Sequence, residues 1–198
     1  MIRPSEFLVI GTSKQLSKLV SVSRNWGGDV DVIPVPPAKN LGSWCDSHMN
    51  MPTHITKTCG CAFFYLHKIR HIRKYLSSEC TEKLIHAFIT SSLDYCSSLL
   101  YGVRNNHMQK LQRVMDASAR LIFCAPKHCH ITPLLLRLHW LPIRLRIEFK
   151  ILLINYKVLQ GSAPQYLIDL ISVLPPSRYD LRRNNIGILL STPKTSKE

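Results

Sequence analysis

Apolar residues recur at steps of three and four positions through most of the segment from residue 53 to about residue 174. This spacing places them on one side of an α-helix, whereas a half-buried strand alternates every second residue. It predicts three long helices and one short helix, over residues 53–76, 78–102, 105–123 and 132–138. Ser78 is the predicted N-cap of the second helix, and Gly102 marks its end. The chain is therefore expected to be mostly α.

Residues 138–153, LHWLPIRLRIEFKILL, resemble a strand at first, because apolar and charged residues alternate from Ile143 to Ile151. The run is too long for a typical strand, and Pro142 and Gly161 suit the first helical position and the position just past a helix end. We therefore predict a helix whose charges form two thin stripes. Two apolar faces lie between the stripes: Leu145, Phe149, Leu152 and Tyr156 on one, and Ile147, Ile151, Ile154 and Val158 on the other. Both are expected to pack, whereas a membrane-surface helix has a single apolar face.

The first 50 residues differ from the rest, because their apolar runs are short and are separated by turn formers. Two or three strands are predicted here, from residues 6–11, 31–35 and 41–46, with a short helix near Ser13 to Val20. The expected architecture is a helical bundle over residues 51–176 preceded by a small β segment over residues 1–50. Residues 177–198 are expected to be a basic, poorly ordered tail.

The 198-residue chain carries a formal net charge of +14, which favours polyanions as partners: nucleic acid first, acidic membrane surface second. Seven cysteines without regular spacing do not resemble a secreted disulfide framework. The N-terminus lacks signal-peptide features, and the sequence has no uncharged apolar stretch long enough to span a membrane. We therefore predict an intracellular protein, nuclear or cytoplasmic, without a membrane partner.

Residues for catalysis are sparse. Two-metal phosphoryl transfer needs clustered carboxylates, yet only Asp29 and Asp31 lie close together, beside a Gly-Gly turn that explains them. The chain has no phosphate-binding glycine loop and no dinucleotide fingerprint. We predict no catalytic residue, no cofactor and no small-molecule substrate.

The segment CAPKHCH at residues 124–130 contains four residue types that bind zinc: Cys124, His128, Cys129 and His130. Zinc usually takes its ligands as separated pairs, so that the chain can wrap around the ion. These residues are crowded and no second pair follows at the usual distance. A loop that ends a helix is therefore predicted in place of a metal site.

Basic residues on two predicted helices are the candidates for a binding site. Those on the first helix are Lys57, Lys68, His71 and Lys74, with His67 on the same face and Arg70 and Arg73 at its flanks; those on the third are Lys110, Arg113 and Arg120. Such rows neutralise phosphates without reading bases. The alternative is a solvated helix face with no partner.

Five segments resemble, in this order, the back part of a LINE-type reverse transcriptase, the polymerase of retrotransposons without long terminal repeats. They are KTCGCAFFYLHKIRHIRKYLS, HAFITSSLDYCSSLLYG, KLQRVMDASARLI, HITPLLLRLHWLPIRLRIEFKILL and APQYLIDLI. The upstream EFLVIG and KNLGSWCDS resemble the strands that follow the family's catalytic motif. The resemblance covers roughly residues 5 to 190.

The resemblance implies strands at the end of a palm, followed by thumb and connection helices that grip a template–primer duplex. The family's catalytic Asp-Asp pair occurs nowhere in the sequence. The family's Lys-Thr-Glu appears as Pro4-Ser5-Glu6, and the family continues beyond a stretch that resembles Pro193 to Thr195. The expectation is a fragment cut at both ends, unable to polymerise DNA but able to bind RNA–DNA or other duplexes.

Two alternatives remain open at this point. The chain could be a small helical protein with a structural or protein-interaction role, whose basic faces are only solvated. It could also be a pseudogene product without function, because a fragment lacking the rest of its palm exposes strand edges and apolar surface.

Overall fold

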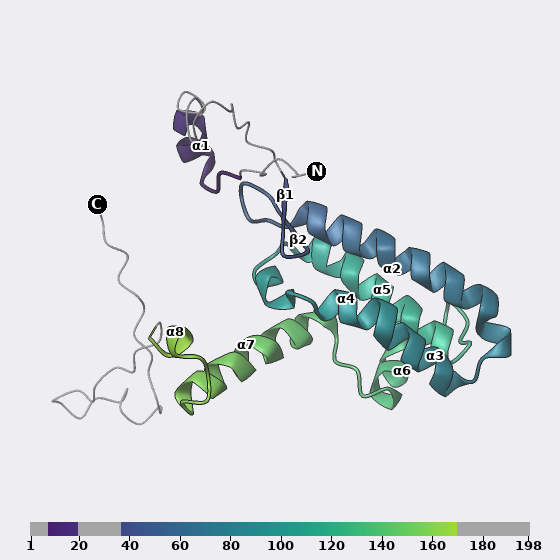
Figure 1. Ribbon diagram of the computed structural model, residues 1–198. Helices are drawn as coiled ribbons and strands as arrows, with labels where there is room; N and C mark the ends of the chain where they lie inside the picture. The colour runs from purple at the N-terminus through teal and green to yellow at the C-terminus, as the bar shows by residue number, and fades with distance from the viewer. Residues whose placement is uncertain (1–7, 20–36, 170–198) are drawn as a thin grey trace, which may run out of the picture. The chain divides into compact units, whose positions relative to one another are not determined.

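A computed structural model describes residues 8–19 and 37–169, and the chain divides into two units, residues 1–147 and 148–198. The predicted tail and the predicted strand at residues 31–35 lie outside the described residues. The described part is mostly helical with a small sheet before the main helices, as predicted. Its elements (Figure 1) are α1 Ser13–Leu19, β1 Ala38–Asn40, β2 Ser43–Cys45, α2 Pro52–Ile72, the 3-10 helix η1 Arg73–Tyr75, α3 Ser78–Ile85, the π-helix η2 His86–Thr90, α4 Ser91–Asp94, the 3-10 helix η3 Ser97–Leu100, α5 Asn105–Ile122, α6 Ile131–Arg137, α7 Ile143–Leu159 and α8 Gln165–Ile168.

The sheet is a β-hairpin in which β1 pairs with β2 antiparallel. Its two-residue turn is Leu41-Gly42, where both φ angles are positive, at 45° and 90°, as in the type I′ turns that match strand twist. The strand predicted over residues 41–46 therefore begins two residues later, and β1 was not predicted. Residues 8–11, the described part of the predicted strand at 6–11, form no strand.

The hairpin lies against the start of α2. The Nζ atom of Lys57 is 3.0 Å from the ring centroid of Trp44, and the backbone N–H of Met51 donates to the Asp46 carboxylate at 2.8 Å. The hairpin and α2 belong to the same unit, so the change near residue 50 is a change of secondary structure inside that unit.

The core of the first unit is formed where α2 packs against α5 (Figure 1). The stripe predicted for the first helix is buried along α2, at Ile55, Cys59, Ala62, Leu66 and Ile69. α5 contributes Leu111, Val114, Met115, Ala119 and Ile122. The side chain of Arg73, directly after α2, reaches the carbonyl of Leu121 near the end of α5. The two helices therefore run in the same direction, and their C-terminal ends lie together.

The segment predicted as one helix over residues 78–102 is broken. Its N-cap is Ser77, whose Oγ accepts a hydrogen bond from the backbone N–H of Cys80, so the assignment of Ser78 was wrong by one residue. The helix passes through a π-helical turn and ends at Asp94, and Cys96 then takes a left-handed φ of 51°. A left-handed residue cannot continue a right-handed helix. Because this residue is not a glycine, the break could not be predicted from the sequence.

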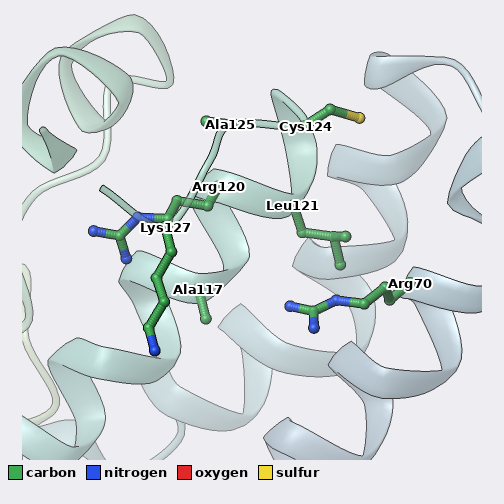
Figure 2. Close-up of a pocket in the computed structure, with 7 residues that line it drawn as sticks. All are labelled: Arg70, Ala117, Arg120, Leu121, Cys124, Ala125 and Lys127. Atoms are coloured by element: carbon green, nitrogen blue, oxygen red, sulfur yellow. The ribbon is translucent and has the colours of Figure 1, made fainter. Parts of the chain in front are cut away.

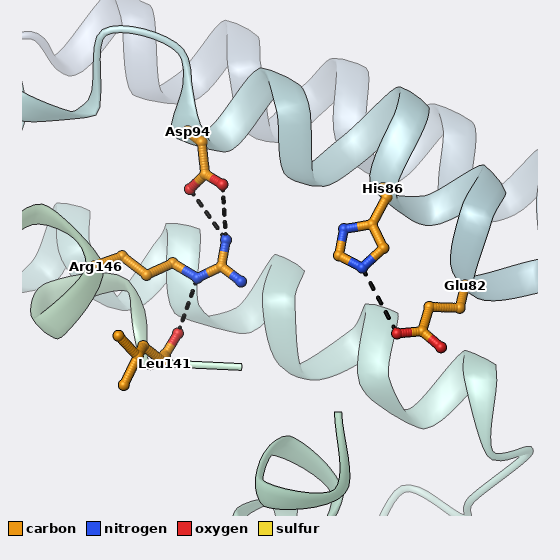
Figure 3. Close-up of polar contacts among 5 residues, drawn as sticks. All are labelled: Glu82, His86, Asp94, Leu141 and Arg146. Atoms are coloured by element: carbon orange, nitrogen blue, oxygen red, sulfur yellow. Dashed lines mark hydrogen bonds and ion pairs between the residues drawn. The ribbon is translucent and has the colours of Figure 1, made fainter. Parts of the chain in front are cut away.

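Arg146 ties the first turn of α7 to α4 within the first unit (Figure 3). Its Nη1 atom lies 2.8 and 3.1 Å from the two carboxylate oxygens of Asp94, and its Nε donates to the carbonyl of Leu141 at 3.1 Å. The backbone N–H of Ile143 also donates to the Gln112 side chain of α5. These bonds fix the start of the helix predicted from residues 138–153.

The prediction of helix for that segment is confirmed, because α7 runs from Ile143 to Leu159. It ends in a Schellman motif. Gly161 has a φ of 68°, its N–H donates to the carbonyl of Val158, and the N–H of Ser162 donates to the carbonyl of Lys157. The expected packing of both apolar faces holds only in part for the face of Ile147 and Val158, where Ile154 is exposed, and is wrong for the other face. The exposed residues of that face are Leu145, Phe149, Leu152 and Tyr156. In the described ranges, no helix combines the length and apolar character that crossing a membrane requires.

His54 gives the first unit a pH-dependent stability. Its side chain is buried at the start of α2, where its Nδ1 accepts from the N–H of Trp44 at 3.5 Å. Burial lowers its pKa, so the unfolded chain binds a proton more readily than the folded one. Folding stability is then lost as the pH falls through the unfolded pKa of about 6.5.

The substitution H54Q removes this titrating group. We therefore expect H54Q to reduce the loss of unfolding free energy between about pH 7.5 and about pH 5.5. Urea unfolding at the two pH values measures the free energy of unfolding. H128Q, which alters an exposed loop histidine, is the control, and equal losses in both variants contradict the assignment.

Candidate nucleic-acid interface

The basic residues predicted on the first helix are exposed along α2. They are Lys57, His67, Lys68, Arg70, His71 and Lys74. On α5, Lys110 and Arg113 are exposed and Arg120 is half-buried. The residues thus have the surface position that a binding role needs. Which of them lie together depends on how α2 and α5 pack.

A pocket between α2 and the end of α5 brings two of the predicted residues together (Figure 2). Its volume is about 570 Å³. The residues that line it are Arg70 from α2, Ala117, Arg120 and Leu121 from α5, and Cys124, Ala125 and Lys127 from the loop that follows. Three of these seven side chains are cationic and none is acidic. The pocket therefore attracts anions.

The loop after α5 supplies Lys127 through its backbone conformation. α5 ends in a Schellman motif. The N–H of Ala125 donates to the carbonyl of Arg120 at 2.9 Å, and the N–H of Cys124 donates to the carbonyl of Leu121. Cys124 takes the left-handed φ of 49° that this motif requires. The chain turns back there, which carries Lys127 to the pocket beside Arg120. Lys127 was not predicted from the sequence, because it lies outside any helical repeat.

Arg120 has unused hydrogen-bonding capacity. Its Nε atom is buried and has no hydrogen-bond partner, and its Nη2 reaches the carbonyl of Cys129 only at 3.5 Å. Buried donors in native proteins almost always have an acceptor. An anion in the pocket would lie beside a guanidinium that still has donors to offer.

Arg73 does not belong to the basic face, which corrects the prediction that it flanks that face. Its Nε and Nη2 donate to the carbonyls of Leu121 and Ile122 at 3.0 and 2.7 Å, and its Nη1 donates to the carbonyl of Leu76 at 2.7 Å. Two of these bonds reach carbonyls in the last turn of α5, where helix carbonyls lack the usual partner within the helix, and the third reaches the carbonyl of Leu76 directly after η1. Arg73 is therefore a structural residue.

One more predicted residue lies beside the pocket: Arg113 precedes Ala117 by four positions, so both lie on the same side of α5. Lys74 lies beyond the end of α2, on η1, and its ammonium is 4.7 Å from the ring centroid of Tyr75. On α5, Lys110 lies near the buried Cys59, where its charge opposes the larger effect of burial, which raises the pKa of that thiol. We define the basic groove as Arg70, Arg113, Arg120 and Lys127.

The remaining predicted residues do not join the basic groove. Lys68 is two positions from Arg70, which is roughly 200° around a helix, and its ammonium lies 5.4 Å from the ring centroid of Phe64. Lys57 lies over Trp44 of the hairpin. His71 is hydrogen-bonded to His67. The eight predicted residues therefore fall into at least two groups on the surface of the first unit.

The loop predicted for residues 124–130 is confirmed, since these residues form turns between α5 and α6. Within residues 8–19 and 37–169, no group of three or more His, Cys, Asp or Glu side chains is placed to hold a metal ion. Asp29 and Asp31 lie outside these ranges.

The fold and the groove define a class: a basic helical bundle with a cation-lined pocket between two parallel helices. Comparison with known proteins adds no family to this class, because no family model, no curated protein and no solved structure matches the chain.

Proposed function

We propose that the chain binds the sugar–phosphate backbone of nucleic acid duplexes through the basic groove, without sequence preference and without catalysis. The observation that supports this most directly is the pocket that Arg70 and Arg120 share with Lys127. The role corresponds to that of thumb and connection helices in a LINE-type reverse transcriptase, the family that five sequence segments resemble. The setting that we propose is intracellular, and all seven cysteines of the chain are free thiols.

Phosphate is the anion that best fits this arrangement. A guanidinium presents several donors in one plane and matches the geometry of phosphate oxygens. Cations on two parallel helices and one loop can contact successive phosphates of a backbone. A single carboxylate would contact only one of these cations. The net charge of +14 adds a field that attracts polyanions from a distance.

Sequence-independent binding follows from the residue types. The basic groove is composed of Lys and Arg, and contacts to phosphate fix position and orientation without carrying base information. The Asp-Asp pair that holds the metal ions of polymerisation in the LINE-type family is absent from the sequence. Binding is therefore the whole of the proposed activity.

A protein-interaction role is the second candidate, and a different surface supports it. On α2 and the π-helical turn, the rings of Tyr65 and Phe88 stack with centroids 5.0 Å apart, and Phe64 lies against Tyr65 edge to face. Phe64 and Phe88 are exposed. Exposed aromatic side chains are enriched at protein interfaces. F64S separates the two roles, because it removes one ring of this aromatic surface and should leave duplex binding by the basic groove unchanged.

The proposed binding should depend steeply on salt. A protein that contacts about four phosphates is expected to lose about a hundredfold in affinity between about 50 mM and about 200 mM salt. Fluorescence anisotropy with two RNA–DNA duplexes of unrelated sequence measures both the salt slope and the sequence dependence. Absence of binding at the lower salt by folded protein contradicts the proposal, and so does a strong preference for one sequence.

Cys124 reports where the duplex lies. It lines the pocket and is exposed, while the equally exposed Cys61 and Cys80 lie elsewhere on α2 and α3. Bound duplex should slow the alkylation of Cys124 by iodoacetamide and leave Cys61 and Cys80 unchanged, as followed by mass spectrometry of the digested protein. Equal protection of all three would place the duplex outside the pocket.

A further inference from the structure

Two histidines form an exposed pair on α2. His67 and His71 are one helical turn apart, and their Nε2 atoms lie 2.9 Å from each other. Their ring centroids are 4.5 Å apart and the ring planes are nearly perpendicular, at 86°. The side chains thus present two nitrogen atoms side by side at the surface of a rigid helix.

We propose that His67 and His71 chelate a divalent transition-metal ion that prefers nitrogen ligands in a square or octahedral arrangement, namely Cu²⁺ or Ni²⁺. This inference is independent of the proposed nucleic-acid binding. It rests on the spacing of two nitrogen atoms and needs no third protein ligand. Water fills the other coordination positions.

The short distance between the two nitrogens lets one ion reach both. An ion bound roughly 2.05 Å from each nitrogen, with the roughly 90° angle of tetragonal sites, holds them roughly 2.9 Å apart. The observed separation of 2.9 Å is set by the hydrogen bond between the rings, so a small rotation of the two rings brings both nitrogens onto one ion. Imidazole nitrogen suits copper and nickel, and copper leads the affinity order of the divalent first-row ions.

Binding exchanges a hydrogen bond for two metal–nitrogen bonds. In the unliganded pair, one Nε2 carries the proton and the other accepts it. The donating ring must move its proton to Nδ1, so that both Nε2 lone pairs face the ion. Both rings must then be neutral, and no other group needs to gain or lose a proton.

The charges around the pair give the site a distinctive salt response. Lys68, Arg70 and Lys74 lie within four positions of the pair on the same helix and repel a divalent cation. Added salt screens this repulsion, so nickel affinity should rise a few-fold between about 50 mM and about 200 mM salt. The proposed duplex binding falls over the same range, so the two activities can succeed or fail separately.

Calorimetric titration of the full chain with NiCl₂, in a phosphine reductant that keeps the thiols reduced, tests the site. H67Q and H71Q should each weaken nickel binding by about tenfold or more, because the second nitrogen binds intramolecularly. H128Q alters an exposed histidine of the loop at residues 124–130 and should leave affinity unchanged.

A rescue variant separates chelation from a change in the fold. F63H/H71Q rebuilds a pair of histidines one turn apart, using the exposed position of Phe63, and should restore the affinity that H71Q loses. Loss in both single variants with recovery in F63H/H71Q supports the site. Nickel binding that is unchanged in H67Q and H71Q, or that F63H/H71Q fails to restore, overturns it.

Discussion

R73M is expected to lower the free energy of unfolding by about 3 kcal/mol. Methionine keeps most of the apolar length of the arginine side chain but removes all three hydrogen bonds to the carbonyls of Leu76, Leu121 and Ile122. Bonds from a charged donor contribute about 1.5 to 3 kcal/mol each, and partial access of water to the freed carbonyls offsets part of that loss. The connection between the ends of α2 and α5 is lost at the same time.

Urea unfolding followed by far-ultraviolet circular dichroism measures this change. R113M is the matched control, because it removes an exposed arginine from α5 and should change stability by less than about 0.5 kcal/mol. If the two variants unfold at the same urea concentration, Arg73 is not the structural residue that its contacts indicate.

R70Q/R120Q is expected to weaken duplex binding by about 10- to 100-fold at low salt. Both residues line the pocket, and glutamine keeps a polar side chain of similar length while removing the charge. If each arginine neutralises one phosphate, the slope of log affinity against log salt should become shallower by about two units. Fluorescence anisotropy over a series of salt concentrations gives both quantities.

K57Q/K68Q is the matched control for that experiment. It also removes two positive charges, but at positions of α2 that do not join the basic groove. Lys57 lies over Trp44, and Lys68 lies near Phe64. A specific groove predicts a much smaller effect for K57Q/K68Q than for R70Q/R120Q. Equal effects would mean that only the total charge of the chain matters, and the pocket would lose its assigned role.

The helices α2 and α5 could be predicted because each buries one regularly spaced stripe. The stripe of α2 from Ile55 to Ile69 is an example. The helix from Ile143 to Leu159 was predictable for another reason, its length between Pro142 and Gly161. The ends that were missed have a common cause. Cys96 adopts a left-handed backbone although it is not glycine, so the break after α4 leaves no mark in the sequence. The turn at Leu41-Gly42 likewise has leucine at its first position.

The candidate site was predictable as a set of exposed charges but not as a geometry. Helical spacing put Arg70 and Lys74 on the surface, yet nothing in it shows that Arg70 meets Arg120, because that depends on α2 and α5 running in the same direction. Lys127 reaches the pocket only through the turn at Cys124. Arg73 looked like another surface cation, and only its contacts with α5 show that it belongs to the structure.

The parallel packing of α2 and α5 has an electrostatic consequence. The C-terminal end of a helix macrodipole is equivalent to roughly half a negative charge, and two such ends lie together here, because Arg73 joins the end of α2 to Leu121 and Ile122. Antiparallel helices would cancel these partial charges, whereas parallel ones add them. Arg70, Arg73 and Arg120 lie within the last turn of α2 or α5 or directly after it, so the backbone itself offsets part of their mutual repulsion. In the proposed role, the cations of the pocket would already be gathered before a phosphate arrives, and binding would not have to supply the free energy of gathering them.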